Sequence, residues 1–393
     1  MGNSIHHSET IYNMLKKINL TEKLSKLYIS HIMTIMIAIF SIGYRGKTVN
    51  FETHRVHHRT TIAHFLNKGK WDETIVENIL KEEVRKLIYK EAQCTGKPVY
   101  LIIDDTISSK TKPSSKAKHP IEDAYFHFSH LKKKSDYGHQ AIAVMLSCNG
   151  ITLNYAIIMY DKSVSKIELI CRIASELPVA PVVSYLLCDS WYVCDKVINS
   201  FISKGFYTIG ALKTNRIIYP HGIKCNVSSF ASALKESAMP FHIVTVKKRK
   251  YNIFRYEGNL NGIDNAVVLI SFPVDTMDNP NTLRAFISTD VSLSSEEILN
   301  VYVNRWAIEV FFRDCKTKLA FDGYQIRSRK GIRRFWIITS LAYFVACSQL
   351  KSFHFSEGFS LLSHSIHREQ ILYIYNFGKS GQDISGLFSM LVS

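Results

Sequence analysis

The chain of 393 residues exceeds the usual size of one domain, and predicts two or three domains with a core that needs no disulfides. The 49 Lys and Arg residues outnumber the 33 Asp and Glu residues, and the formal net charge of +16 favours a polyanionic partner, with a merely basic soluble protein as the alternative. Eight scattered cysteines without a C-x-x-C pair exclude a disulfide framework and a cysteine-based zinc site, and indicate reduced thiols.

The first 95 residues show helical periodicity and predict an N-terminal helical domain, residues 1–95, that binds DNA. Its apolar segment 32–40 is too short to span a bilayer, so we expect a buried helix and no membrane association. The N-terminus has no signal-sequence pattern, and a cytoplasmic, nucleoid-associated protein is expected. Segment 53–65, rich in His and Arg, either contacts the DNA backbone or forms a solvated loop between helices.

From residue 99 the hydrophobic period changes to that of strands. A short apolar strand ends in Asp104 and Asp105, and two more strand-like runs flank Asn149-Gly150, a strong hairpin signal. A helix, a strand, a second helix and a further strand follow over 166–213. This order predicts an α/β fold with a mixed sheet flanked by helices, and it places Asp189 at the carboxyl end of a parallel strand.

Residues 214–290 predict a β-rich insertion, because strand-like runs alternate there with Asn, Gly, Pro and Asp turns. A helix is expected to begin after Ser294, since Glu297 three residues later completes a capping box. The expected organisation is therefore a catalytic core in two parts, 96–213 and 291–350, separated by the insertion and followed by a helical tail at 351–393.

The helix after Ser294 carries an unusual polar line. At 100° per residue, Tyr302, Arg305, Glu309 and Lys316 fall within an arc of roughly 60°, with Arg313 beside it. Apolar side chains flank this line on both sides: Val303, Trp306 and Val310 on one, and Val301, Ile308, Phe312 and Leu319 on the other. Because a surface ladder of ion pairs normally lies on a wholly polar face, the pattern predicts an acid in a cleft with phosphate-binding neighbours.

Two strands and this helix together supply carboxylates. Asp104 and Asp105 follow one strand, Asp189 follows another, and Glu309 comes from the helix. Oxygen-only ligands suit Mg²⁺, and Mn²⁺ could substitute. Two such ions can activate a water or a 3′-hydroxyl for in-line phosphoryl displacement, so a two-metal site is expected.

These residues resemble a known family. Tyr302-x2-Arg305-x3-Glu309-x6-Lys316 is similar to the Y-R-E-K signature of insertion-sequence DDE transposases of the insertion-sequence-four-like group, and "IDDT" and "CDS" resemble its two aspartate blocks. The resemblance covers residues 99–350. It implies a ribonuclease-H-like core with a β-rich insertion before the glutamate.

The resemblance also implies roles for individual residues. The metal ligands would be Asp189, Glu309 and one member of the doublet: the form D-x-[ST] favours Asp104, and an E-D-T variant favours Asp105. Tyr302, Arg305 and Lys316 would hold the terminal phosphates of the transposon end. We expect Glu309 within metal-bridging reach of Asp189 and of one member of the doublet.

Basic side chains around this core are further candidates for DNA contacts, although each alone could be a solvated charge. They are Arg313, Lys213, Arg216, Arg327 and Arg329. A zinc site is the alternative for four histidines, disfavoured because no cysteine lies near them; they are His119, His127, His130 and His139.

The sequence thus predicts a cut-and-paste DNA transposase that binds double-stranded DNA at terminal inverted repeats, cleaves it with Mg²⁺ and joins 3′-hydroxyls to target DNA. A homodimer is expected in the synaptic complex, since two ends must be paired. The alternatives are a metal-dependent nuclease without strand transfer and a non-catalytic DNA-binding protein descended from a transposase.

Overall fold

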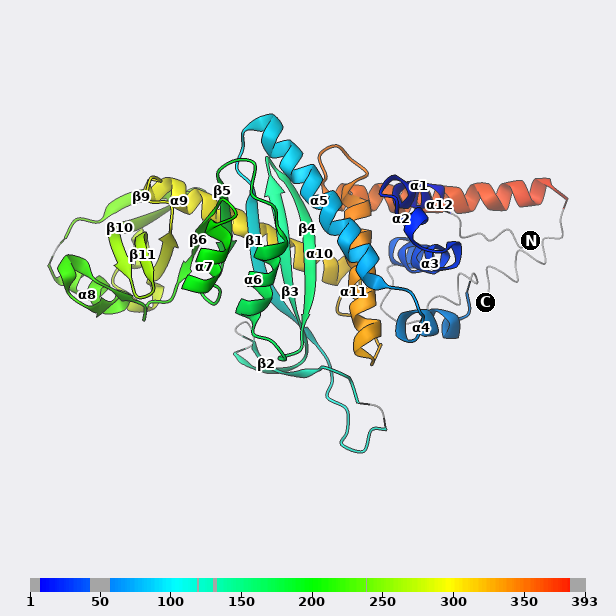
Figure 1. The fold of residues 1–393 in the computed structure, drawn as a ribbon, viewed down its shortest axis with the longest axis horizontal. Coiled ribbons are helices and arrows are strands. Elements are labelled where there is room, and N and C mark those ends of the chain that lie inside the picture. Colours follow the sequence, from blue (N-terminus) through cyan, green and yellow to red (C-terminus); the bar gives the residue numbers. More distant parts are fainter. Residues whose placement is uncertain (1–7, 43–56, 119, 130–132, 238, 382–393) are drawn as a thin grey trace.

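The fold is seen in a computed structural model that describes residues 8–42, 57–118, 120–129, 133–237 and 239–381. It is a mixed α/β structure in which helices gather at one end and an extended sheet continues to the other (Figure 1). The predicted segment 53–65 lies partly outside the described residues. From Arg59 onward it is helical rather than a loop.

The N-terminal part is helical, as predicted. Its helices are α1 Glu9–Lys17, α2 Leu20–Lys23, α3 Lys26–Ile42, α4 Arg59–Asn67 and α5 Glu73–Thr95. The buried helix expected at 32–40 is confirmed, because every residue of α3 from His31 to Phe40 is buried. Helix α3 packs against α4, α11 (Arg329–Cys347) and α12 (Phe355–Lys379), which cover its apolar surface. No helix in the described part of the chain is long and apolar enough to cross a membrane.

A 12-stranded sheet forms the rest of the frame. Its first strands are β1 Tyr100–Ser109, β2 Tyr125–Ser129, β3 Lys134–Cys148, β4 Ile151–Tyr160, β5 Ser184–Cys188 and β6 Phe206–Leu212. The order along the sheet is β2-β3-β1-β5-β6, with β4 also paired to β3. Strand β5 runs parallel to β1 and β6, whereas β3 is antiparallel to its neighbours. The predicted mixed sheet is confirmed.

The turn between β3 and β4 shows why the hairpin was predictable. Asn149 and Gly150 both have positive φ, at 49° and 85°. Both central residues of a type I′ turn need this conformation, which Asn and Gly adopt most easily.

The β-rich segment after residue 213 extends the same sheet. Its strands are β7 Ile217–Ile218, β8 Cys225–Asn226, β9 His242–Val246, β10 Arg249–Leu260, β11 Ile263–Pro273 and β12 Arg284–Ser288. Strand β12 pairs with β6, so this segment is joined to the sheet by backbone hydrogen bonds. It also contains α8, Val227–Glu236, which the sequence did not predict.

Helices complete the layers. Helices α5 and α11 pack against β4, while α6 (Lys166–Glu176) packs against α7 (Asp195–Ile202), which contacts β6. Helix α9 (Ser295–Tyr302), a single 3-10 turn at Val303–Arg305 and helix α10 (Trp306–Lys318) follow β12. The capping box of Ser294 and Glu297 at the start of α9 is confirmed. The predicted tail is α12 as far as Lys379, and residues 382–393 lie outside the described part.

The buried ring of His31 predicts a dependence of stability on pH. It lies 4.3 Å from the ring of His57, between centroids, and neither of its nitrogens has a hydrogen-bond partner among the described residues. Burial, and then the neighbouring His57, lowers the pKa of His31 to about 4. Because this pKa lies below that of His31 in the unfolded chain, the unfolded chain binds the proton more readily. The folded protein therefore loses stability as the pH falls from about 6.5 to 4.

When the pH is lowered from 7 to 5, the free energy of unfolding of the His31→Leu variant should therefore rise by about 1–2 kcal/mol relative to that of the wild type. The measurement is denaturant unfolding of both proteins across this range. A constant difference between them would contradict the assignment of a neutral buried His31.

Candidate active site

The register of the parallel strands brings two carboxylates together. Ile103 of β1 is aligned with Cys188 of β5, and this is where the parallel ladder ends. The next residue of β1 is Asp104 and the residue after β5 is Asp189, so both lie at the edge where the parallel pairing ends. Strand β1 itself continues to Ser109 by pairing with β3, so the doublet lies within a strand and not at its end as predicted.

The environment of these acids opposes their negative charge. Burial, together with the charges of Asp189 and Asp105, raises the pKa of Asp104 to about 7, although Arg305 acts in the opposite direction. Burial also raises the pKa of Asp189, while hydrogen bonds from the Trp191 and Tyr192 amides lower it. The Trp191 amide donates to Asp189 Oδ1 at 2.9 Å. Nearby carboxylates with raised pKa values would be stabilised by a cation.

Arg305 links Asp104 to the helix that follows the sheet. Its Nη1 lies 2.6 Å from Asp104 Oδ2, and its Nη2 lies 2.7 Å from Glu309 Oε1, one helical turn further on. The guanidinium thus connects the two carboxylates that were predicted to be joined by metal. No group of three His, Cys, Asp or Glu side chains that could hold a metal ion is found among the described residues, and the ligand set of Asp104, Asp189 and Glu309 stays a prediction.

Charge balance explains the position of Arg305. Partly buried carboxylates approach one another only around positive charge, and the Arg305 guanidinium supplies this charge between Asp104 and Glu309. The guanidinium stands in for a cation between Asp104 and Glu309. Their oxygens, with those of Asp189, are the hard ligands that Mg²⁺ and Mn²⁺ prefer, so the donor set fits such an ion.

Asp105 has different partners. It accepts hydrogen bonds from Gln140 Nε2 at 2.5 Å, Lys166 Nζ at 2.7 Å and the Tyr192 hydroxyl at 2.9 Å. Successive side chains of a strand point to opposite faces, which separates Asp105 from Asp104. The two members of the doublet therefore occupy distinct environments.

The basic residues of the polar line contact protein atoms as well. Lys316 Nζ donates to Thr106 Oγ1 at 2.7 Å and to the Ile107 carbonyl at 3.2 Å. These hydrogen bonds connect α10 to Thr106 and Ile107 of β1, which closely follow Asp104 in the same strand. Arg313 projects into solvent, with 65 % of its side chain exposed.

Tyr302 lies three residues before Arg305. Its ring packs edge-on against the ring of Phe286, with centroids 5.0 Å apart. Burial raises the pKa of Tyr302 to about 12, so its hydroxyl is a neutral group at ordinary pH. Tyr302 also lines a mainly apolar pocket, together with Tyr251, Arg284 and other side chains of the β-rich segment.

The predicted apolar wall is only partly correct. Ile308, Phe312 and Leu319 are buried. Trp306 is 58 % exposed, contrary to the prediction that it packs beside the polar line. The 3-10 turn immediately before it interrupts the regular helix on which that prediction was based.

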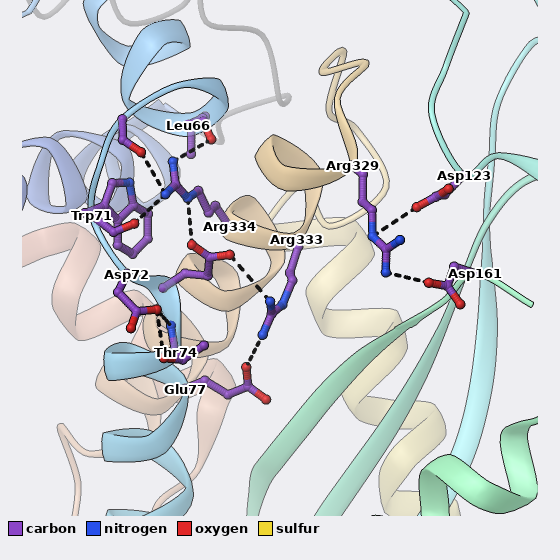
Figure 2. Close-up of polar contacts among 12 residues, drawn as sticks. Leu66, Trp71, Asp72, Thr74, Glu77, Asp123, Asp161, Arg329, Arg333 and Arg334 are labelled. Carbon is purple, nitrogen blue, oxygen red and sulfur yellow. Dashed lines mark hydrogen bonds and ion pairs between the residues drawn. The ribbon is translucent and has the colours of Figure 1, made fainter. Parts of the chain in front are cut away.

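The remaining predicted DNA contacts are dispersed. Lys213 Nζ lies 5.0 Å from the centroid of the Trp191 ring, and Arg216 Nη2 donates to the Asn261 carbonyl. Arg329 lies 3.1 Å from Asp123 and 2.5 Å from Asp161, and these two acids compensate its charge (Figure 2).

The backbone carbonyl of Arg327 accepts a hydrogen bond from the Glu122 amide. In the described chain the histidines belong to no metal cluster: His139 contacts Tyr324 and the Glu122 carbonyl. His119 and His130 lie outside the described residues.

Two neighbouring residues of the site were missed. Trp191 is 54 % exposed two positions after Asp189, and Tyr192 is fully buried with its hydroxyl on Asp105. The sequence signal was the aromatic pair directly after "CDS". Helical or strand periodicity gives no information about side chains in such a turn.

The family model described as "Transposase DDE domain" matches residues 95–345, which include both aspartates and the glutamate of the site. A comparison with curated proteins finds no match.

Proposed function

Since the chain belongs to the family defined by the transposase DDE domain, we propose that it cleaves DNA at the ends of a mobile element and joins the 3′-hydroxyls to target DNA. The observation that carries the proposal is the strand register, which brings Asp104 and Asp189 to one edge, together with Arg305, which connects Asp104 to Glu309. The family resemblance implies two aspartates and one glutamate as the catalytic acids, and here they would come from two strands and one helix.

Asp104 is the proposed first acid. It shares Arg305 with Glu309, whereas Asp105 is already surrounded by three donors, one of them a lysine. A carboxylate so fully hydrogen-bonded has little capacity left for a metal ion. The spacing D-x-T, with Thr106, agrees with this assignment.

DDE transposases generally use divalent metal ions. Asp104, Asp189 and Glu309 would hold two ions of Mg²⁺ or Mn²⁺, and this metal would supply activation of the attacking water or hydroxyl and stabilisation of the leaving oxygen. Asp104 and Asp189 are half-buried, and the backbone amide of Trp191 orients the Asp189 carboxylate.

Arg305 has a second proposed role. Its guanidinium can make paired hydrogen bonds to a phosphate as readily as to carboxylates, so a DNA phosphate can replace one of its carboxylate partners. Tyr302 precedes this arginine in the chain and Lys316 follows it. We propose that both hold terminal phosphates of the transposon end together with Arg305, as the Y-R-E-K pattern of the insertion-sequence-four-like group implies. Arg313, which is exposed on the same helix, would contact the DNA backbone.

The proposal extends to the whole chain. The mixed α/β architecture is consistent with a ribonuclease-H-like core at 96–213 and 291–350, with 214–290 as its β-rich insertion. The helical residues 1–95 would contact end DNA, and Lys213, Arg216, Arg327 and Arg329 would add contacts to its phosphates. A homodimer would pair two ends, acting in the cytoplasm on nucleoid DNA. The net charge of +16 supports a polyanionic partner.

The test is incubation of the full-length protein with DNA that contains both boundaries of the element carrying the gene, plus a supercoiled target and Mg²⁺ or Mn²⁺. We expect nicks at the boundaries and covalent joining of the new 3′ ends to the target. Cleavage without joining would favour the nuclease, and binding without cleavage would favour the non-catalytic protein.

A further inference from the structure

Behind the candidate active site lies a buried polar cluster that the proposed chemistry does not use. It consists of Asp105, Gln140, Lys166 and Tyr192, and we call it the Asp105 cluster. These residues come from β1, β3, the start of α6 and the turn after β5. Four separate segments of the chain therefore meet at one carboxylate.

The contacts of the cluster are close and largely shielded from water. Asp105 Oδ2 accepts from both Lys166 Nζ, at 2.7 Å, and the Tyr192 hydroxyl, at 2.9 Å, while Gln140 occupies the other oxygen at 2.5 Å. The side chains of Lys166 and Asp105 are 13 % and 22 % exposed, and Tyr192 is fully buried. Hydrogen bonds in such surroundings fix the positions of both partners, because water cannot readily replace either one.

Tyr192 connects this cluster to the catalytic edge. It is three residues after Asp189, and its amide donates to the Asp189 carbonyl at 3.2 Å. Trp191, the residue before Tyr192 in the turn, donates its amide to Asp189 Oδ1 at 2.9 Å. The turn that orients the Asp189 carboxylate is thus held to β1 through the Tyr192 hydroxyl.

Asp105 is also the immediate neighbour of Asp104 in β1. The same residue therefore fixes the strand that carries one proposed metal ligand and the turn that carries another. Lys166 balances its charge, and its ammonium group also lies 5.5 Å from the centroid of the Trp191 ring, on the same turn.

We propose that Asp105 is a positioning residue which, through Tyr192, sets the distance and orientation of Asp189 relative to Asp104. This inference rests on the proposed function, since it assigns Asp104 and Asp189 as metal ligands. It gives the second aspartate of the "IDDT" motif a role distinct from that of the first. Residues that orient metal ligands commonly affect metal affinity or activity 10- to 100-fold.

The experiment compares Tyr192→Phe and Asp105→Asn with Asp104→Asn in the full-length protein. Tyr185→Phe is a matched control, because the Tyr185 hydroxyl donates to Asp290 Oδ2 at 3.0 Å, a buried tyrosine–aspartate bond outside the proposed metal site. Mn²⁺ affinity is measured without DNA from the electron paramagnetic resonance signal of the free ion. The rate of end cleavage is then measured as a function of Mn²⁺ concentration.

We expect Tyr192→Phe and Asp105→Asn to weaken Mn²⁺ binding by about 10- to 100-fold, with cleavage largely restored at high Mn²⁺. Asp104→Asn should not be restored, and Tyr185→Phe should bind Mn²⁺ like the wild type. The inference is overturned if Tyr192→Phe matches Tyr185→Phe in Mn²⁺ affinity. It is equally overturned if Asp105→Asn abolishes cleavage at every Mn²⁺ concentration while Asp104→Asn retains it.

The readouts separate this inference from the proposed function. A wild-type protein that binds Mn²⁺ but cleaves no end DNA would refute the function. The relative Mn²⁺ affinities of Tyr192→Phe and Tyr185→Phe would still decide the role of the cluster. Thermal unfolding of each variant shows whether the fold is retained, and Tyr192→Phe keeps the test open if Asp105→Asn does not fold.

Discussion

Glu309→Gln should reduce the rate of end cleavage by roughly 10³-fold or more, the kinetic equivalent of about 4 kcal/mol. The substitution keeps the size of the side chain and an oxygen that can accept from Arg305, but it removes one negative charge from the proposed metal ligands. A metal ion supplies several kcal/mol of charge stabilisation in such a transition state, and a neutral ligand holds it poorly. The measurement is single-turnover cleavage of labelled end DNA at saturating protein.

The control is Glu296→Gln, an identical change of an exposed residue in the first turn of α9. It should leave the rate within about twofold, since a solvated charge on α9, outside the proposed metal site, contributes little. Binding of end DNA by Glu309→Gln should persist, because the phosphate-binding side chains are retained. Cleavage at the wild-type rate by this variant would remove Glu309 from the catalytic assignment.

The positions of the acids could be predicted because strand order and hydrophobic period determine which residues follow a buried strand. Ile103 and Cys188 end apolar runs, and the parallel register puts the next residue of each run at one edge of the sheet. The Asn149-Gly150 turn and the cap at Ser294 were predictable for a similar reason. In each case the conformation depends on a few adjacent residues.

The partners of those acids could not be predicted. Nothing local in the sequence says that Asp105 is bonded to Lys166, 61 residues away, and to Tyr192, 87 residues away. Likewise, the sequence placed Arg305 on DNA, while in the structure it bridges Asp104 and Glu309. Which partner a charged group takes depends on every charge nearby, and these come from distant segments.

The extent of the sheet is a third example. Strand β12 was predicted as part of a β-rich insertion, yet its pairing with β6 continues the central sheet into that segment. Helix α8 was missed within the same segment, although Asn226 caps it through the Ser229 amide. A short helix surrounded by strand-like sequence gives too weak a periodic signal to be recognised.

Arg334→Met should lower the free energy of unfolding by about 3–5 kcal/mol, the usual cost of breaking a buried ion pair by removing one partner. The Arg334 guanidinium, on α11, is fully buried and donates to Glu73 Oε2 at 3.0 Å. It also donates to backbone carbonyls around the end of α4 and the turn that follows: Phe65, Leu66, Gly69 and Trp71. Figure 2 shows the contacts with Leu66 and Trp71.

Methionine fills a similar volume but donates no hydrogen bond, so the carbonyls and Glu73 would lose their partner while remaining buried. A single ammonium has too few donors, in the wrong geometry, to replace the planar guanidinium, and Arg334→Lys should recover only part of the loss. Denaturant unfolding of the full-length protein, followed by circular dichroism, provides the measurement.

The adjacent Arg333 is the matched control. Its side chain is 41 % exposed and forms ion pairs with Glu77 at 2.9 Å and Glu73 at 3.5 Å. Arg333→Met should cost at most about 1 kcal/mol, because water and salt screen an exposed pair. Equal losses from the two variants would show that the buried carbonyl contacts of Arg334 contribute nothing beyond an ordinary surface ion pair. A much larger loss at Arg334 would show that this side chain fastens the N-terminal helices to α11, the helix that follows the candidate active site in the chain.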